Sequence, residues 1–173
     1  MEERNNTTTP ATAAKKCSCG WGAFVVGLVV ALILGWWVLP NLMKETKKQP
    51  IAFMLTIGNL AMRIARAQFS CNFLACAGYK VIDNNGFKTV AEGIKAARKA
   101  KADIIVLCSS DDEYATLAPE AWKTLKDAKE LFIVAGAPAC SEDLKALGIN
   151  NFINVRSNVL ETLKTFNAHL LNK

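Results

Sequence analysis

Few side chains in this sequence have the types and spacings that support catalysis. Cys71 and Cys76 lie five positions apart rather than in a CxxC motif, and no paired CxxC pattern of a zinc site occurs. The one histidine, His169, lies near the end of the 173 residues, so no imidazole lies near these cysteines in the sequence to activate a thiol. We therefore predict no catalytic residue and no metal site.

The six cysteines fall into two groups. Cys17 and Cys19 directly precede a long apolar run, where both acylation and an incidental role stay open. The other four lie within apolar runs, as reduced cysteines do when they pack as small hydrophobic side chains: Cys71, Cys76, Cys108 and Cys140. This usage favours a reducing compartment for the C-terminal part of the chain.

Two arginines are candidates for binding an anion. Arg63 and Arg66 lie three positions apart near the start of a predicted helix, where a phosphate or the tail of a coenzyme A could bind. The preceding Gly58-Asn59-Leu60 is not a GxGxxG fingerprint, and no Walker loop occurs. The net charge of +6 is not gathered into a basic stripe with interleaved aromatics, so we expect no nucleic-acid partner.

Residues 20–43 are predicted to form a single transmembrane helix. The run GWGAFVVGLVVALILGWWVL has tryptophans at both ends and is longer than the roughly 7–15 apolar residues of a signal peptide. Residues 1–19 are predicted to be a disordered tail, and residues 44–50 a linker. The lysines and arginines flanking the run are nearly balanced, so the reduced cysteines decide our expectation of a single-pass membrane protein with a cytoplasmic C-terminal domain.

Residues 51–173 alternate between short apolar runs and helical patterns. Asp103–Cys108, DIIVLC, is a β-branched run suited to burial on both faces of a sheet. Ser141 is the predicted N-cap of a short helix. The predicted strands are 51–57, 79–82, 103–108, 131–135 and 152–155, and the predicted helices are 60–77, 89–101, 113–128, 141–147 and 158–171.

This alternation predicts a flavodoxin-like (Rossmann-like) α/β domain. Parallel strands joined by right-handed crossovers place helices on both faces, and the common order for five strands is 2-1-3-4-5. Ligands in such sheets bind beyond the carboxyl ends of the strands. The candidate loops are therefore 58–59, 84–86, 109–111 and 136–138.

The globular part resembles the C-terminal, cobalamin-binding-type domain of methylmalonyl-CoA mutase and looks closest to that of the small, non-catalytic subunit. The resemblance is carried by the segments MLTIGNLAMRIARAQFSCNF, AGYKVIDNNGF, ADIIVLCSSDDEYATLAPEAW, IVAGAP and INVRSNVLETL. Cobalamin-binding members of the family carry Asp-x-His-x-x-Gly after the first strand, where the His ligates cobalt. Here Ala61, Arg63 and Arg66 occupy those three places, and a guanidinium offers no lone pair to a metal.

Other features of the family's cofactor site are kept. By the resemblance, Ser109 and Ser110 match the place where the cofactor's nucleotide tail is hydrogen-bonded, and Ala135-Gly136 matches the glycines that leave space for it. Together with Gly58 and Arg63 these residues make up a vestigial cobalamin slot, although the same small residues also suit the turns of this fold. We expect Arg63 and Arg66 to face solvent, a partner's acidic group, or Asp111 and Asp112, and His169 to have a surface or packing role.

The resemblance implies a module that is not catalytic alone, because the family's reaction needs a (β/α)₈ barrel of about 250 residues. One hypothesis is a membrane-tethered structural or interaction module for a mutase catalytic subunit, with no cofactor and with Met54 and Met62 filling the slot. The alternative is a membrane-anchored corrinoid (cobalamin) binding protein without a histidine ligand, with an open slot between Ser109 and Gly136. A mutase fragment fused to an unrelated anchor is a third reading.

Overall fold

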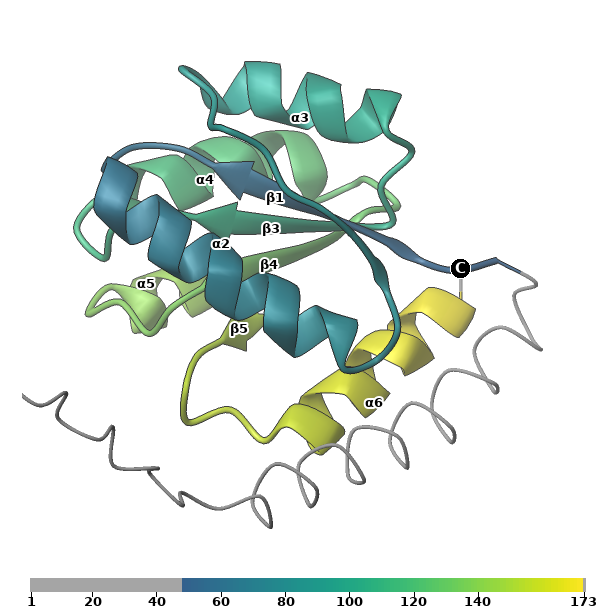
Figure 1. Ribbon diagram of the computed structural model, residues 1–173. Helices are drawn as coiled ribbons and strands as arrows, with labels where there is room; N and C mark the ends of the chain where they lie inside the picture. The colour runs from purple at the N-terminus through teal and green to yellow at the C-terminus, as the bar shows by residue number, and fades with distance from the viewer. Residues whose placement is uncertain (1–47, 173) are drawn as a thin grey trace, which may run out of the picture.

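The structure is a computed structural model that describes residues 48–172. In chain order its elements are β1 (Ile51–Thr56), α2 (Leu60–Ala75), β2 (Lys80–Ile82), α3 (Val90–Lys99), β3 (Ile104–Cys108), α4 (Tyr114–Leu125), β4 (Leu131–Ala135), α5 (Ser141–Ala146), β5 (Phe152–Ile153) and α6 (Val159–Leu171). Strands and helices alternate along the whole described part of the chain (Figure 1).

The strands form one parallel five-stranded sheet in the order β2-β1-β3-β4-β5, which confirms the predicted topology. β1 pairs with β2 on one side and with β3 on the other, with Ala52 opposite Ile104 and Thr56 opposite Cys108. β3 and β4 are buried along their whole length, as expected for β-branched strands covered on both faces. The switch in strand order at β1 places loops from both neighbours at its carboxyl end.

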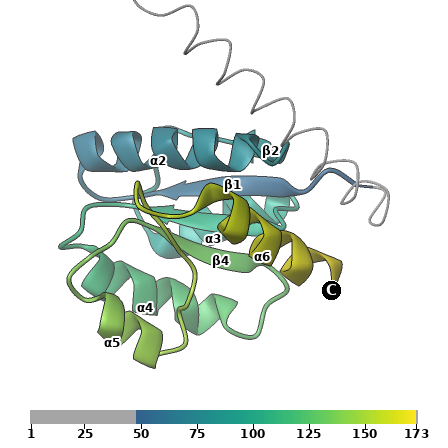
Figure 2. The same ribbon diagram turned by 90° about the horizontal axis from the view of Figure 1, so that it is seen from below.

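Two helical layers cover the sheet (Figures 1 and 2). α2 and α6 pack on one face, where Met54 and Leu74 lie in the same core cluster as Phe166. α3, α4 and α5 pack on the other face, around Leu55 and Leu107. Successive residues of β1 point to opposite faces, so each of its apolar side chains enters one of the two cores.

Side chains at the helix starts explain where three of the helices begin. Asn59, Thr89 and Asn158 each accept a hydrogen bond from the backbone N–H three residues on, which satisfies a donor that the first helical turn leaves open. The prediction of Ser141 as an N-cap is wrong. Cys140 holds the cap position of α5 without a side-chain bond, because the turn in which the Ser141 N–H donates to the Pro138 carbonyl already brings Ser141 into the helix.

Most predicted boundaries agree with the structure within two or three residues. Residues 131–135 form β4 as predicted, whereas α2 ends two residues early and α4 three. β5 ends at Ile153 rather than at residue 155, and Val155 is 86% exposed. Val155 is not buried, although the apolar pattern predicts it to be, because the chain has already left the sheet at this residue.

The predicted transmembrane helix at residues 20–43 and the tail at 1–19 lie outside the described residues, and the linker at 44–50 lies largely outside them. Between residues 48 and 172 no helix combines the length and apolar character needed to span a bilayer. Membrane tethering therefore stays a prediction.

The cysteines of the described part are all free, but they differ in burial. Cys108 is buried in β3, and its burial raises the pKa of the thiol to about 12, so this cysteine packs as a small hydrophobic residue as predicted. Cys76 is exposed at the end of α2, and Cys71 and Cys140 are half-buried. The prediction of burial is wrong for Cys76, because it lies where the helix ends rather than on its inner face.

Candidate functional site

The six residues of the vestigial slot all lie at the carboxyl edge of the sheet. Gly58 follows β1, Ser109 and Ser110 follow β3, and Ala135 and Gly136 end β4 and its turn. Arg63 lies in the first turns of α2. The structure brings five of these residues together around two side chains from the start of α4, Glu113 and Tyr114, and it directs Arg63 elsewhere.

The Glu113 carboxylate joins the loops that follow β1 and β3. Its Oε2 accepts hydrogen bonds from the hydroxyls of Ser109 (2.5 Å) and Ser110 (2.7 Å). It also accepts from the backbone N–H groups of Asn59 (3.1 Å) and Ser110 (3.3 Å). The two serine hydroxyls, more than any other group, lower the pKa of Glu113 to about 2, so the side chain is a carboxylate at neutral pH.

Gly58 is required where it packs against this carboxylate. Its φ of +78° lies in the left-handed region, and a Cβ built on it would overlap the Glu113 carboxylate. The serines that the resemblance assigns to a cofactor's tail, and the glycine beside them, therefore bind a side chain of this protein instead.

Tyr114 packs at the carboxyl ends of β3 and β4. It is fully buried, and its hydroxyl accepts from the Ser109 N–H (3.0 Å) and donates to the Ala135 carbonyl (2.5 Å). A Cβ on Gly136 would lie 3.2 Å from the Tyr114 ring, so the room left by this glycine is taken by the ring. Burial raises the pKa of Tyr114, so the phenol stays neutral.

An ion pair covers the outer side of the same space. The Arg66 Nη2 donates to both carboxylate oxygens of Asp111, at 2.9 and 3.0 Å. The Asp111 Oδ1 would lie 3.2 Å from a Cβ on Gly136, and the Arg66 Cζ 3.4 Å from it. Of the three alternatives expected for Arg66, the structure contains the pairing with Asp111.

Of the two methionines that the sequence suggested as plugs of the slot, only Met54 is buried. Met54 is fully buried within the core shared by α2 and α6, whereas Met62 is 37% exposed on α2. The prediction of Met62 as a plug is wrong, because the turn of α2 on which it lies points toward solvent. Glu113, Tyr114 and the Arg66–Asp111 pair occupy the region between Gly58, Ser109 and Gly136.

These residues do not fit a cobalamin held in the manner of the family. The position of the cobalt ligand carries Arg63, which has no lone pair to offer. The space for the nucleotide tail, between Ser109 and Gly136, is occupied by Tyr114. His169 lies exposed in the last turn of α6, and residues 48–172 contain no cluster of three or more His, Cys, Asp or Glu side chains that could hold a metal ion.

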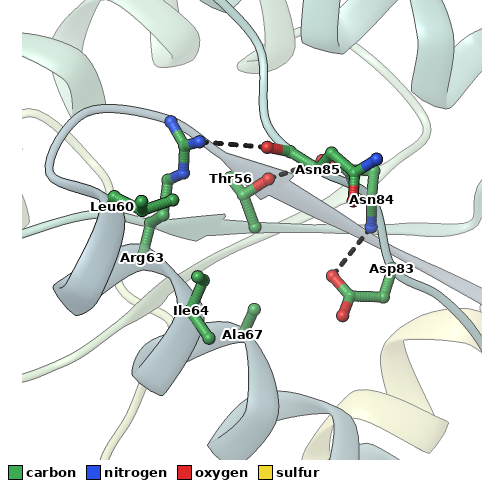
Figure 3. A pocket seen from close by; sticks show the side chains of 8 residues that line it. All are labelled: Thr56, Leu60, Arg63, Ile64, Ala67, Asp83, Asn84 and Asn85. Atoms are coloured by element: carbon green, nitrogen blue, oxygen red, sulfur yellow. Dashed lines mark hydrogen bonds between the residues drawn. The ribbon is translucent and has the colours of Figure 1, made fainter.

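Arg63 turns away from the slot toward the loop that connects β2 to α3 (Figure 3). Its Nη1 donates to the Gly58 carbonyl (3.2 Å) and its Nη2 to the Asn85 carbonyl (3.0 Å). The side chain borders a pocket of about 340 Å³ on the β2 side of β1. The carboxyl end of β1 thus has a filled side and an open side.

Sequence reasoning missed Glu113 and Tyr114, the two residues that fill the slot. One signal was present, since Ser110 and Glu113 have the S-x-x-E spacing of a capping box, in which a glutamate accepts from a backbone N–H three residues earlier. The structure contains that bond. For Tyr114 the sequence holds no comparable signal, because its hydrogen bond to the Ala135 carbonyl joins α4 to a strand 21 residues further along the chain.

The parallel sheet order β2-β1-β3-β4-β5 with helices on both faces defines a flavodoxin-like α/β domain. Comparison with known proteins makes this specific. Over 124 residues the chain is 64% identical to the methylmalonyl-CoA mutase small subunit of Porphyromonas gingivalis, which confirms the resemblance to that subunit. The match covers 72% of this chain and 20% of the relative, so the chain spans about a fifth of that protein's length.

A second relative is similar over a shorter stretch. The chain is 48% identical over 54 residues to the multiheme cytochrome c subunit of a menaquinone reductase from Nitratidesulfovibrio vulgaris. This match covers 31% of the chain and 26% of that subunit. No family model matches the chain.

Proposed function

We propose that this protein is a membrane-tethered, non-catalytic module that serves a mutase-like partner in a structural or docking role. The observation that carries the proposal is the slot filled by Glu113 and Tyr114 at the place where the fold would otherwise hold a cofactor. A domain whose own side chains fill its ligand site keeps the fold of the family but not its cofactor chemistry. The 64% identity to a mutase small subunit supports a mutase as the kind of partner.

The apolar run at residues 20–39 supports the membrane tether, since it has the length and flanking tryptophans of a bilayer-spanning helix. Confinement to a membrane raises the effective concentration of a partner at that surface, so weak contacts suffice for docking.

The tether is tested by extracting membranes that contain the full chain with alkaline carbonate. The protein should stay in the membrane pellet, and a variant with Val26→Arg and Val30→Arg should move to the supernatant, because each arginine at the centre of a spanning helix costs about 2.5–3.5 kcal/mol on insertion scales. Release of the unaltered chain by carbonate would contradict the tether. Protease added from outside sealed cells then reports on which side residues 48–172 lie.

The partner role is tested by co-expressing the full chain with the methylmalonyl-CoA mutase catalytic subunit of the same organism. The two should co-purify from solubilised membranes at a fixed ratio. The control is a chain in which residues 51–173 are replaced by an unrelated flavodoxin-like domain, so that recruitment by the tether alone is recognised. The docking role would be overturned if the control chain recovered as much catalytic subunit as the unaltered chain. It would also be overturned if neither chain recovered the catalytic subunit.

A further inference from the structure

The pocket beside Arg63 lies outside the filled slot, between the first half of α2 and the loop that follows β2 (Figure 3). Its volume of about 340 Å³ lies near the lower end of the roughly 300–1,000 Å³ of small-molecule sites. A pocket of this size at the carboxyl edge of a parallel sheet is where such folds bind their ligands.

The polar wall of the pocket is held in place by its own hydrogen bonds. The Asn84 side chain pairs with the Thr56 hydroxyl (2.5 Å), accepts from the Gly86 N–H (3.0 Å) and donates to the Met54 carbonyl. These bonds fasten the loop to the end of β1 and leave Asn84 little capacity for another partner. The wall is therefore preformed, and a ligand would not have to order it.

Arg63 is fixed in position, but its charge is not neutralised. Its two hydrogen bonds go to the uncharged carbonyls of Gly58 and Asn85. Gly86, with φ of +106°, lets the guanidinium lie against the backbone, since a Cβ there would be 2.6 Å from the Arg63 Cζ. Of the ion pairs formed within residues 48–172, none includes Arg63, whereas Arg66 is paired with Asp111.

Apolar side chains border the same pocket on α2. Leu60 is 60% exposed and Ile64 is 54% exposed, although both are large hydrophobic residues. They lie four positions apart, so they share the helix face from which Arg63 also projects. The pocket therefore places one cation beside an exposed apolar surface.

We infer that this pocket binds a small aliphatic monocarboxylate. Two of the five guanidinium N–H donors are used by the two carbonyls, which leaves three for a carboxylate. The alkyl chain would cover Leu60 and Ile64. Asp83, at the other end of the pocket, disfavours a phosphate dianion, because its carboxylate would repel the second negative charge of such a ligand.

Butyrate titrated into the full-length chain tests the inference, with the Ile64 methyl groups and the Arg63 side-chain Nε–H followed by NMR. We expect saturable shifts of both signals, tighter binding of butyrate than of acetate, and no shifts with the neutral butanamide. Arg63→Gln should weaken butyrate binding by about tenfold or more, as the loss of a charged hydrogen-bond donor does. Arg156→Gln, which alters an exposed arginine outside the pocket, should leave binding unchanged.

Absence of saturable shifts with butyrate, or equal shifts with butanamide, would overturn the inference. So would butyrate binding that Arg63→Gln leaves intact. Should Arg63→Gln fail to fold, Ile64→Ser decides the matter, because it should remove the preference for butyrate over acetate while keeping Arg63. None of these outcomes bears on the proposed docking role, which depends on the filled slot.

Discussion

The two sides of the carboxyl end of β1 have opposite characters. On the side of β3 and β4 the protein fills its own cavity, since Glu113 bridges two loops and Tyr114 occupies the space beside Gly136. On the side of β2 it leaves a pocket with an unneutralised arginine and exposed apolar side chains. The small residues that the resemblance assigns to a cofactor site therefore pack against side chains of this protein, whereas the β2 side keeps a pocket.

The largest expected effect on stability comes from removing the Tyr114 ring, which fills the slot on the side of β3 and β4. Tyr114→Ala removes a fully buried ring and should lower the free energy of unfolding by about 3–5 kcal/mol, as removal of buried aromatic rings does. Chemical denaturation of the full chain measures it. Tyr114→Phe is the matched control and should cost about 1–3 kcal/mol, because the Ser109 N–H and the Ala135 carbonyl lose their partner. If Tyr114→Ala left the free energy of unfolding unchanged, the Tyr114 ring would not fill the slot and the slot would be open.

The next effect tests the packing of the first loop on Glu113. Gly58→Ala should destabilise the protein by about 1–3 kcal/mol, since it combines a left-handed backbone with an overlap against the carboxylate. Glu113→Ala in the same chain should recover part of this loss of stability. A double-mutant cycle then gives the interaction free energy between the two positions. Strict additivity of the two substitutions would show that Glu113 does not occupy the space above Gly58.

A pH titration of stability isolates the charge on Glu113. Its pKa is lowered from 4.5 to about 2 in the folded protein, so the stabilisation is present above pH 4.5 and is lost as the pH falls from 4.5 toward 2. The Glu113→Gln variant should lack this pH-dependent stabilisation. Its free energy of unfolding should therefore fall less steeply as the pH is lowered. The effect should be smaller than that of Gly58→Ala, because solvent reaches part of the carboxylate. If the free energy of unfolding fell equally steeply with decreasing pH in both proteins, the hydrogen-bonded carboxylate would be contradicted.

The smallest expected effect comes from the ion pair over the slot. Asp111 is 46% exposed, and Asp111→Asn should change the free energy of unfolding by about 0–1 kcal/mol, as for other solvent-exposed pairs. The difference from the unaltered protein should shrink further in 1 M salt, where charges are screened within about 3 Å. A loss several times larger would mean that the pair, rather than Tyr114, holds the slot closed.

The sequence predicted the fold well because local and global signals agreed. The alternation of apolar strands with capped helices, such as Thr89 before α3, is set by residues near one another in the chain. The errors lie at element ends, as at Ser141 and Val155, where a turn or a departure from the sheet overrides the local pattern. Boundaries of this kind are decided by tertiary contacts that the pattern does not contain.

The candidate site was predictable in position but not in content. The strand order places Gly58, Ser109 and Gly136 at one edge, so their meeting could be expected. What fills the space between them could not, since Tyr114 binds backbone groups from β4 and from the loop after β3. The open pocket beside Arg63 depends likewise on the way the loop after β2 folds back onto β1 through Asn84.

The most direct test of the filled slot is a titration of the full chain with hydroxocobalamin and with adenosylcobalamin, followed by absorbance and calorimetry. Because Tyr114 and Glu113 occupy the space that a nucleotide tail would need, we predict no heat and no spectral change at about 100 µM cofactor, well above the concentrations at which specific cofactor sites saturate. Stoichiometric binding with the spectrum of a cobalamin that keeps its own base on cobalt would contradict the account and make the protein a corrinoid carrier.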